Sequence, residues 1–375
     1  MQQTICVAAY TLRYLEGGAY MWAFLNWALG LRALGFRVIW LDSVLEDMPE
    51  AEIIERAGKL KTRLAPHGLA DDLAVVRRDG SPLHVPGCLS ALEIEYCEIL
   101  IDLGYDLDVD IVKRFARSVF VDIDPGLTQV WLKDGDLHIA PHRYYFTYGE
   151  TVGEPGSKVP DCGLPWLYTP PPIFLAAWQL GPPPPAAPFT TVSSWWGEWL
   201  VLDGRLVDNS KRAAFMEFLP LPAQTTAKLE LALPITSHEA DTTDLRLLVE
   251  NGWSVRQAAE VSATPRAFQD YIAYSRGEFS CLKRGYRVLE TAWMSERTLN
   301  YLASGRPAVI QHTGRSRILP DAEGLFRFRT TEEAARYLDN AQLNYEFQSK
   351  AARSLVEEHF DSAKVLTRVL ERVMA

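Results

Sequence analysis

Basic and hydroxyl-bearing residues near the end of an α/β segment at residues 274–319 are suited to binding an anion. Lys283 lies in a turn after an expected strand, where a cation neutralises phosphate oxygens. Ser295 precedes an amphipathic run at residues 298–304 and is the expected N-cap of a helix there. The free N–H groups and partial positive charge of a helix start suit a diphosphate. The same pattern also fits an ordinary helix followed by a strand.

A second segment with possible chemistry is the loop Glu16-Gly17-Gly18, between an expected strand at residues 3–10 and an expected helix at 20–34. Paired glycines let the backbone approach a ligand, or let a helix pack closely on a sheet. The loop lacks the glycine spacing of a dinucleotide site. It therefore predicts either a loop that faces a ligand or a simple turn.

Carboxylates follow the expected strand at residues 119–123. Ligands of open α/β sheets bind beyond the carboxyl ends of the strands, so Asp124 is a candidate for the acceptor side of a reaction. The alternative is that Asp124 only caps the turn that it starts. His138 and His142 are separated by Pro141, which prevents the regular helix that a histidine metal pair needs, so no metal site is expected.

Composition excludes several classes of protein. The chain has 375 residues, of which 48% are hydrophobic, so we expect two domains of ordinary size. Its net charge of -10, without a dense Lys/Arg block, argues against a nucleic-acid partner. No apolar run is long enough to span a membrane.

The cysteines and the N-terminus indicate the expected compartment. The five cysteines are an odd number without metal-like spacing, so they are expected to be free thiols in a reducing cytoplasm. Residues 1–10 lack the basic start of a signal peptide. We expect a cytoplasmic protein; its oligomeric state is left open.

Strands and helices alternate in the first half. Alternation of this kind predicts a doubly wound parallel sheet, hence an α/β fold. Further strands are expected at residues 36–41, 73–76, 98–103, 144–150 and 166–172, and helices at 51–69 and 110–116.

The Pro-rich stretch at residues 182–188 is the expected linker between domain 1–181 and domain 189–345. The tail is expected to be helical and broken near residue 360, with residues 346–375 crossing back to the first domain. In the second half we expect strands at 189–194 and 228–233, and helices at 254–259 and 265–275.

The segment from GEFSCLKRGY through WMSERTLNYLASGRPAVIQHTG to AARSLVEEHFDSAKVL resembles the nucleotide-sugar half of a GT-B glycosyltransferase. The resemblance covers roughly residues 189–375, with weaker support before them. It rests on the Ser304-Gly305-Arg306-Pro307 turn after a helix and on the Thr313-Gly314 loop after the next strand. It implies two Rossmann-like domains with parallel sheets that face each other across a cleft.

The resemblance also implies roles for particular residues. Glu16-Gly17-Gly18 matches a glycine-bearing loop after the first strand of such enzymes, and Lys211 matches a basic residue that often reaches the diphosphate. The expected catalytic residues are Glu16, as the base, and Asp124. The expected donor- and phosphate-binding residues are Gly17, Gly18, Lys211, Arg276, Gly277, Glu278, Lys283, Ser295, Glu296, Arg297, Thr313 and Gly314.

One motif of many retaining GT-B enzymes is missing. Their paired glutamates fall at Ala292 and Asn300 of this sequence, so the donor ribose must be held by other groups and the stereochemical outcome is left open. Glu296 and Arg297 lie nearby, and they either substitute for the pair or bind each other.

The resemblance therefore implies a hexosyltransferase that moves a sugar from a nucleotide-diphosphate donor to an unidentified acceptor hydroxyl, without a metal or other cofactor. Two alternatives stay open. One is a nucleotide-sugar epimerase of the same fold, and the other is a nucleotide-sugar-binding protein without catalysis.

Overall fold

The computed structural model of the chain describes residues 2–95, 97–202 and 204–375. Its internal contacts divide the chain into two compact units. Unit 1 comprises Met1–Phe174 and Asp361–Ala375, and unit 2 is the continuous stretch Leu175–Phe360. Each unit is an α/β structure built on one large sheet, and each is described by itself.

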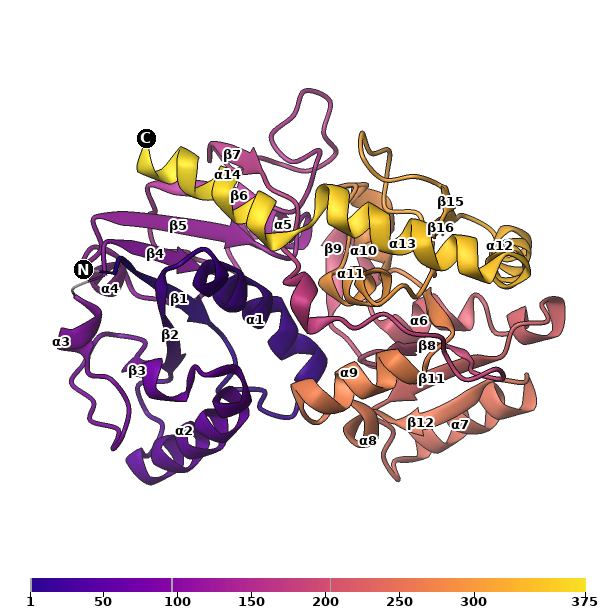
Figure 1. The fold of residues 1–375 in the computed structure, drawn as a ribbon, viewed down its shortest axis with the longest axis horizontal. Helices are drawn as coiled ribbons and strands as arrows, with labels where there is room; N and C mark the ends of the chain where they lie inside the picture. Colours follow the sequence, from indigo (N-terminus) through magenta and orange to yellow (C-terminus); the bar gives the residue numbers. More distant parts are fainter. Residues whose placement is uncertain (1, 96, 203) are drawn as a thin grey trace. The chain divides into compact units, whose positions relative to one another are not determined.

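Unit 1 contains a parallel sheet of seven strands in the order β3-β2-β1-β4-β5-β6-β7 (Figure 1). Its inner strands are buried on both faces, which explains their near-continuous apolar sequences. The strands are β1 (Thr4–Ala9), β2 (Arg37–Val44), β3 (Leu73–Arg77), β4 (Ile99–Asp102), β5 (Arg117–Asp122), β6 (Tyr144–Thr147) and β7 (Trp166–Tyr168).

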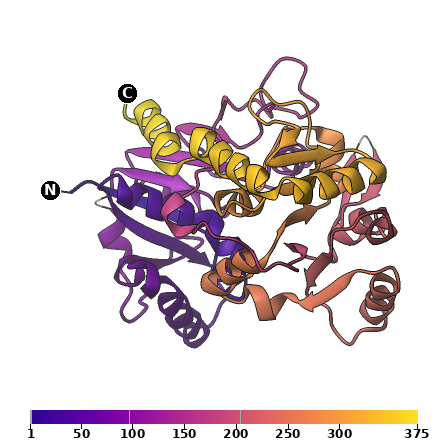
Figure 2. The same cartoon turned by 45° about the vertical axis from the view of Figure 1, so that its right-hand side comes forward.

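Helices complete unit 1. The C-terminal helix α14, drawn in yellow in Figures 1 and 2, packs against α1, and Leu366 and Ser362 of α14 contact Gly30 of α1 closely. The helices are α1 (Gly18–Ala33), α2 (Glu50–Leu64), α3 (Ala91–Ile94), α4 (Val109–Val112), α5 (Leu127–Asp134) and α14 (Ser362–Met374), with 3-10 turns at Ala65–His67 and Ala70–Asp72.

Unit 2 has its own seven-stranded sheet, in the order β12-β11-β8-β13-β14-β16-β15, in which β15 alone of the described strands runs antiparallel to its neighbour. Phe279 and Phe328 stack at 5.4 Å in its core. The strands are β8 (Phe189–Val192), β11 (Leu229–Leu233), β12 (Ser254–Gln257), β13 (Gly277–Ser280), β14 (Ala308–Gln311), β15 (Ala322–Glu323) and β16 (Leu325–Phe328).

A separate hairpin of β9 (Trp199–Leu202) and β10 (Arg205–Asp208) follows β8. This hairpin was not predicted from the sequence. The helices of unit 2 are α6 (Lys211–Met216), α7 (Glu239–Glu250), α8 (Ala258–Ser262), α9 (Pro265–Tyr274), α10 (Arg284–Leu289), α11 (Glu296–Ala303), α12 (Thr331–Leu343) and α13 (Tyr345–His359), with 3-10 turns at Leu175–Ala177 and Leu221–Gln224.

Three sequence expectations differ from the structure. Residues 254–259 were expected to be helical, but Ser254–Gln257 pairs with β11 as strand β12, because an edge strand tolerates the polar sequence SVRQ. The Pro-rich residues 182–188 lie inside unit 2, since the division falls after Phe174. The part of the tail that belongs to unit 1 begins at Asp361, so α13 stays with unit 2.

The cysteines Cys6, Cys88, Cys97, Cys162 and Cys281 are free thiols. Among the described residues, no helix combines the length and apolar character needed to cross a membrane.

Candidate functional site

Arg297 lies at the carboxyl end of the parallel strands of unit 2, in the first turn of α11. Its Nε donates to Glu278 Oε1 at 2.7 Å and its Nη2 to Ser280 Oγ at 2.7 Å. Its Nη1 donates to the backbone oxygen of Val192 at 3.0 Å. The guanidinium therefore fixes the start of α11 against the ends of β8 and β13. Part of its positive charge is compensated by a carboxylate that is fully buried.

Glu278 has one oxygen without a donor. Oε1 binds Arg297, while Oε2 is buried and accepts no hydrogen bond from any described residue. A buried polar atom without a partner costs free energy unless water or a ligand supplies one. Thr313 Oγ1, on the loop after β14, is also buried and without a partner in the described structure. Both atoms belong to the sequence-predicted set.

Lys211 is the first residue of α6, whose N-cap is Ser210. Its Nζ donates to the backbone oxygen of Cys281, directly after β13. Burial disfavours the ammonium form, and the charges of Arg297 and Lys283 disfavour it further, so the pKa of Lys211 falls to about 7. An anion beside these three cations would reverse that repulsion and favour protonated Lys211.

Lys283 immediately precedes α10 and is half-buried. No described residue forms a hydrogen bond or ion pair with its ammonium, so its charge is available to a ligand. Ser295 caps α11 by accepting a hydrogen bond from the backbone N–H of Arg297 at 3.2 Å, as expected. Glu296, the next residue, is buried in the first turn. The strand ends thus gather two lysines, an arginine and a capped helix start.

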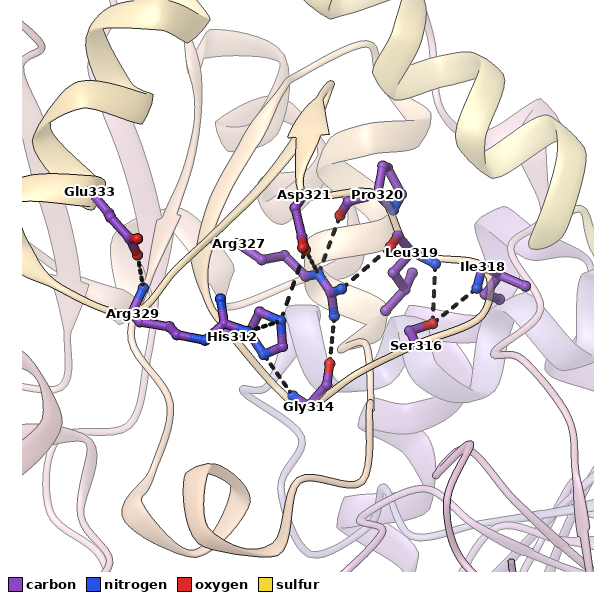
Figure 3. Close-up of polar contacts among 10 residues, drawn as sticks. All are labelled: His312, Gly314, Ser316, Ile318, Leu319, Pro320, Asp321, Arg327, Arg329 and Glu333. Atoms are coloured by element: carbon purple, nitrogen blue, oxygen red, sulfur yellow. Dashed lines mark hydrogen bonds and ion pairs between the residues drawn. The ribbon is translucent and has the colours of Figure 1, made fainter.

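The loop after β14 is held in place by Arg327 of β16 (Figure 3). Its Nη1 donates to the backbone oxygen of Gly314 at 2.9 Å, and its Nε donates to Asp321 Oδ1 at 2.7 Å. Gly314 has a φ of +117°, and a Cβ there would lie 2.6 Å from the Glu290 oxygen. The backbone oxygen of Thr313 accepts from Ala292 N–H at 2.8 Å. This loop and the segment before α11 therefore contact each other through backbone.

His312 begins the same loop. Its Nδ1 accepts from the Gly314 N–H at 3.0 Å, and its Nε2 lies 2.7 Å from Arg329 Nη2 (Figure 3). Burial and the charges of Arg327 and Arg329 lower the pKa of His312 to about 4. The imidazole is therefore neutral at pH 7 and supports the loop without adding positive charge.

Other predicted donor residues lie elsewhere. Arg276 and Gly277 are at the amino end of β13, the end opposite the cations, because the strand starts with Gly277. The Arg276 guanidinium stacks on the Tyr345 ring at 3.7 Å. The structure does not bring these two residues together with Lys211 and Arg297.

The expected glycine loop lies in unit 1, where Gly18 starts α1 and Glu16 is exposed in the turn before it. A Cβ on Gly17 would come within 2.3 Å of the Tyr14 ring, so the close approach there is to an aromatic side chain of the same loop. This contact accounts for Gly17 without a ligand.

The strand-end carboxylates of unit 1 differ in their surroundings. Asp122 is buried and accepts from Thr128 Oγ1, Gln129 Nε2 and Thr147 Oγ1 at 2.6 to 2.7 Å, so it holds the loop after β5. Asp124 is partly exposed, and Tyr105 OH lies 3.4 Å from its Oδ2.

Asp42, in strand β2, is completely buried. Its Oδ2 accepts from Thr11 N, Thr11 Oγ1 and Leu12 N at 2.5 to 3.1 Å, while Oδ1 is buried without a described partner. Burial is the main cause that raises the pKa of Asp42 to about 7. A polar residue at the end of the apolar strand at 36–41 was the available signal.

Arg327 and Ser280 were also missed. Arg327 alternates with apolar residues in β16, a pattern that is typical of an exposed position, and only the tertiary structure shows its contacts. Within residues 2–95, 97–202 and 204–375, no group of three His, Cys, Asp or Glu side chains could hold a metal ion.

Comparison with known proteins finds similarity to solved structures only. No protein-family model and no curated protein sequence matches the chain. Solved structures match along the whole length. An α-glucosyltransferase in complex with UDP and a 13-mer DNA has a TM-score of 0.63 at 9% identity, covering 100% of both chains.

Two other transferases are similar. A pneumococcal O-GlcNAc transferase, in complex with UDP and GlcNAc, has a TM-score of 0.58 at 8% identity, covering 100% of this chain and 99% of that one. A glycosyltransferase of avilamycin A biosynthesis has a TM-score of 0.57 at 12% identity, with 99% and 97% covered. At these identities the likeness concerns the fold.

Proposed function

Since the chain has the GT-B fold of glycosyltransferases, we propose that it moves a sugar from a nucleoside-diphosphate donor to an acceptor hydroxyl without a metal. The observation that carries the proposal is the group of cations at the strand ends of unit 2. Lys211, Lys283 and the start of α11 offer positive charge and N–H donors there. Fold likeness alone would not support an activity.

In the proposed reaction, an acceptor hydroxyl attacks the anomeric carbon while the nucleoside diphosphate leaves. The departing oxygen gains negative charge, which nearby cations and helix N–H groups stabilise. Lys211 and Lys283 take this role, and the Thr313-Gly314 loop places the sugar. Glu16 is the candidate base for the acceptor proton, with Asp124 as the second candidate.

Binding of nucleoside diphosphates tests the donor assignment. In a thermal-shift titration of the full chain with UDP, GDP and ADP, one of them raises the melting midpoint, because ligands that bind the folded state stabilise it. Lys283→Ala lowers the affinity for that nucleotide about tenfold, since one charge-assisted contact contributes roughly 1.5 kcal/mol. Lys350→Ala, in an exposed helical pair with Glu346, is the matched control and binds as the wild type does.

Equal affinity in Lys283→Ala and Lys350→Ala would show that the strand-end cations are not the phosphate site.

Glu16→Gln tests the catalytic base separately. Turnover that continues at the wild-type rate in this variant excludes Glu16 from that role.

The absence of glutamates at positions 292 and 300 favours a second candidate, a nucleotide-sugar-binding protein without catalysis. Product analysis separates the two. Tight donor binding without release of free sugar or a transferred product, over hours and with a broad acceptor panel, would favour the binding protein.

A further inference from the structure

In unit 1, two arginines from separate loops converge on one carboxylate. Arg13 Nη2 and Arg78 Nη2 each lie 2.9 Å from Asp106 Oδ2, and Ser43 Oγ donates to the other oxygen at 2.9 Å. Arg13 Nη1 also binds the Tyr10 hydroxyl. The Asp106 side chain is only 7% exposed. Within this group of side chains, one carboxylate faces two guanidinium charges. The carboxyls of Asp42 and Asp102 lie near Asp106, but burial raises the pKa of both and so favours their neutral forms.

The cluster lies where the strand order reverses. β1 pairs with β2 on one side and with β4 on the other, so the chain leaves β1 towards β2 and returns later to the opposite side as β4. Tyr10 and Arg13 follow β1, and Asp106 follows β4. Ligands of open parallel sheets bind beyond the carboxyl ends of the strands at such a reversal.

The arginines also have N–H groups for which the described residues offer no acceptor. Nε of Arg13 and Nε of Arg78 are buried without a partner among the described residues. Arg78 Nη1 likewise meets no acceptor in the described part of the chain, and this side chain is 33% exposed, so solvent and solutes can reach it. The nearby carboxylate of Glu46 is exposed, so water and salt screen its effect on Arg78.

We propose that Arg13 and Arg78 form a subsite for an anionic group, a carboxylate or a phosphate, carried by the acceptor. The assignment of that anion to an acceptor rests on the proposed function, whereas the subsite itself does not. Guanidinium forks match the geometry of carboxylate and phosphate oxygens and form charge-assisted hydrogen bonds with them.

Site-resolved arginine labelling tests the subsite. The full chain is treated with phenylglyoxal at constant ionic strength, with or without inorganic phosphate or acetate, and labelling is followed by peptide mass spectrometry. We expect phosphate, acetate or both to slow labelling of Arg78 several-fold. Arg114 is the internal control, because it is 31% exposed, lies in the same unit and pairs with Glu95. Protection by acetate alone identifies a carboxylate subsite, and protection by phosphate alone a phosphate subsite.

A second measurement covers the case in which Arg78 is slow to label. The rise in melting midpoint with the same anions should be smaller in Arg78→Gln than in the wild type, and unchanged in Arg114→Gln. Equal protection of Arg78 and Arg114, or the wild-type response in Arg78→Gln, overturns the proposal.

The two proposals fail in different ways. Nucleoside-diphosphate binding with no anion effect at Arg78 overturns only the subsite. Protection at Arg78 in a protein that binds no nucleotide keeps the subsite and overturns the transferase.

Discussion

At the scale of single residues, the stability of unit 2 should depend on the ion pair between Arg297 and Glu278, because Glu278 is fully buried. Replacing Arg297 by Met leaves an uncompensated buried charge and should lower the free energy of unfolding by about 3–5 kcal/mol. Urea unfolding followed by tryptophan fluorescence measures the loss.

The double variant Arg297→Met with Glu278→Gln is the control, since it removes both charges and should recover much of the stability. If the double variant is as unstable as Arg297→Met, then lost packing rather than the unpaired charge explains the effect.

Asp42 should make unit 1 less stable as the pH rises. Its pKa is raised from 3.8 to about 7, so the unfolded chain releases this proton at lower pH than the folded chain. The contribution of Asp42 to stability is therefore fully present below pH 3.8 and is lost as the pH rises towards 7. Asp42→Asn should be more stable than the wild type at pH 8, by up to about 4 kcal/mol, and should lose this advantage near pH 4.

The measurement is chemical denaturation of both proteins from pH 4 to 8, and the difference between them isolates Asp42. A difference that does not change with pH would mean that Asp42 ionises in the folded state as it does in the unfolded chain.

At this scale, the sequence predicts the local role of a residue better than it predicts the partner that the residue binds. The Ser295 cap is local, so its spacing from the helix was sufficient to predict it. The bond between Arg297 and Glu278 joins residues from different elements, and the burial of Glu278 depends on the whole sheet. The Arg13, Arg78 and Asp106 cluster was missed for the same reason.

At the scale of elements, strongly periodic segments were predicted well. The expected strand at 228–233 is β11, and the expected helix at 265–275 is α9 with its Thr264 cap. The break expected near residue 360 is confirmed, because Asp361 caps the new helix α14. Strand β12 and the β9–β10 hairpin were not predicted, because these strands form through pairing with a neighbouring strand and their local sequence does not indicate it.

The loop after β14 depends on Gly314, so Gly314→Ala should disturb it. The new Cβ would overlap the Glu290 oxygen, in a backbone conformation that side chains rarely adopt. We expect a lower melting midpoint together with weaker nucleoside-diphosphate binding.

Gly163→Ala is the matched control. Gly163 also has a positive φ, of +71°, but open space around the missing Cβ, so its loss should be only about 1 kcal/mol, from backbone strain. A similarly small effect in Gly314→Ala would show that the loop can move away from the segment at Glu290.

At the scale of the molecule, two α/β units were expected from length and alternation, but their limits were not. Pro-rich composition suggested a linker at 182–188, whereas contacts place the division after Phe174. Composition reports local stiffness, while a domain limit is set by which surfaces are buried together. No local pattern could show this.

Unit 1 depends on the last helix of the chain. Leu366 of α14 is fully buried, and Leu366→Ala should cost about 2–5 kcal/mol in unit 1. Calorimetry should show that the transition of unit 1 moves to lower temperature, while nucleoside-diphosphate affinity in unit 2 is unchanged.

Glu371→Ala, on the exposed side of α14, is the control and should leave both transitions in place. A loss of nucleotide affinity in Leu366→Ala would mean that the two units do not respond independently.

Unit 1 is built from two separate stretches of the chain, and this affects the order in which the two units can fold during synthesis on the ribosome. Unit 2 is one continuous stretch, so all of its residues have been synthesised while the last residues of unit 1 are still inside the exit tunnel. Folding of multidomain chains usually starts with the N-terminal domain. Here the N-terminal unit cannot be completed first, and until α14 has left the exit tunnel the apolar surface of α1 that α14 covers is available to chaperones.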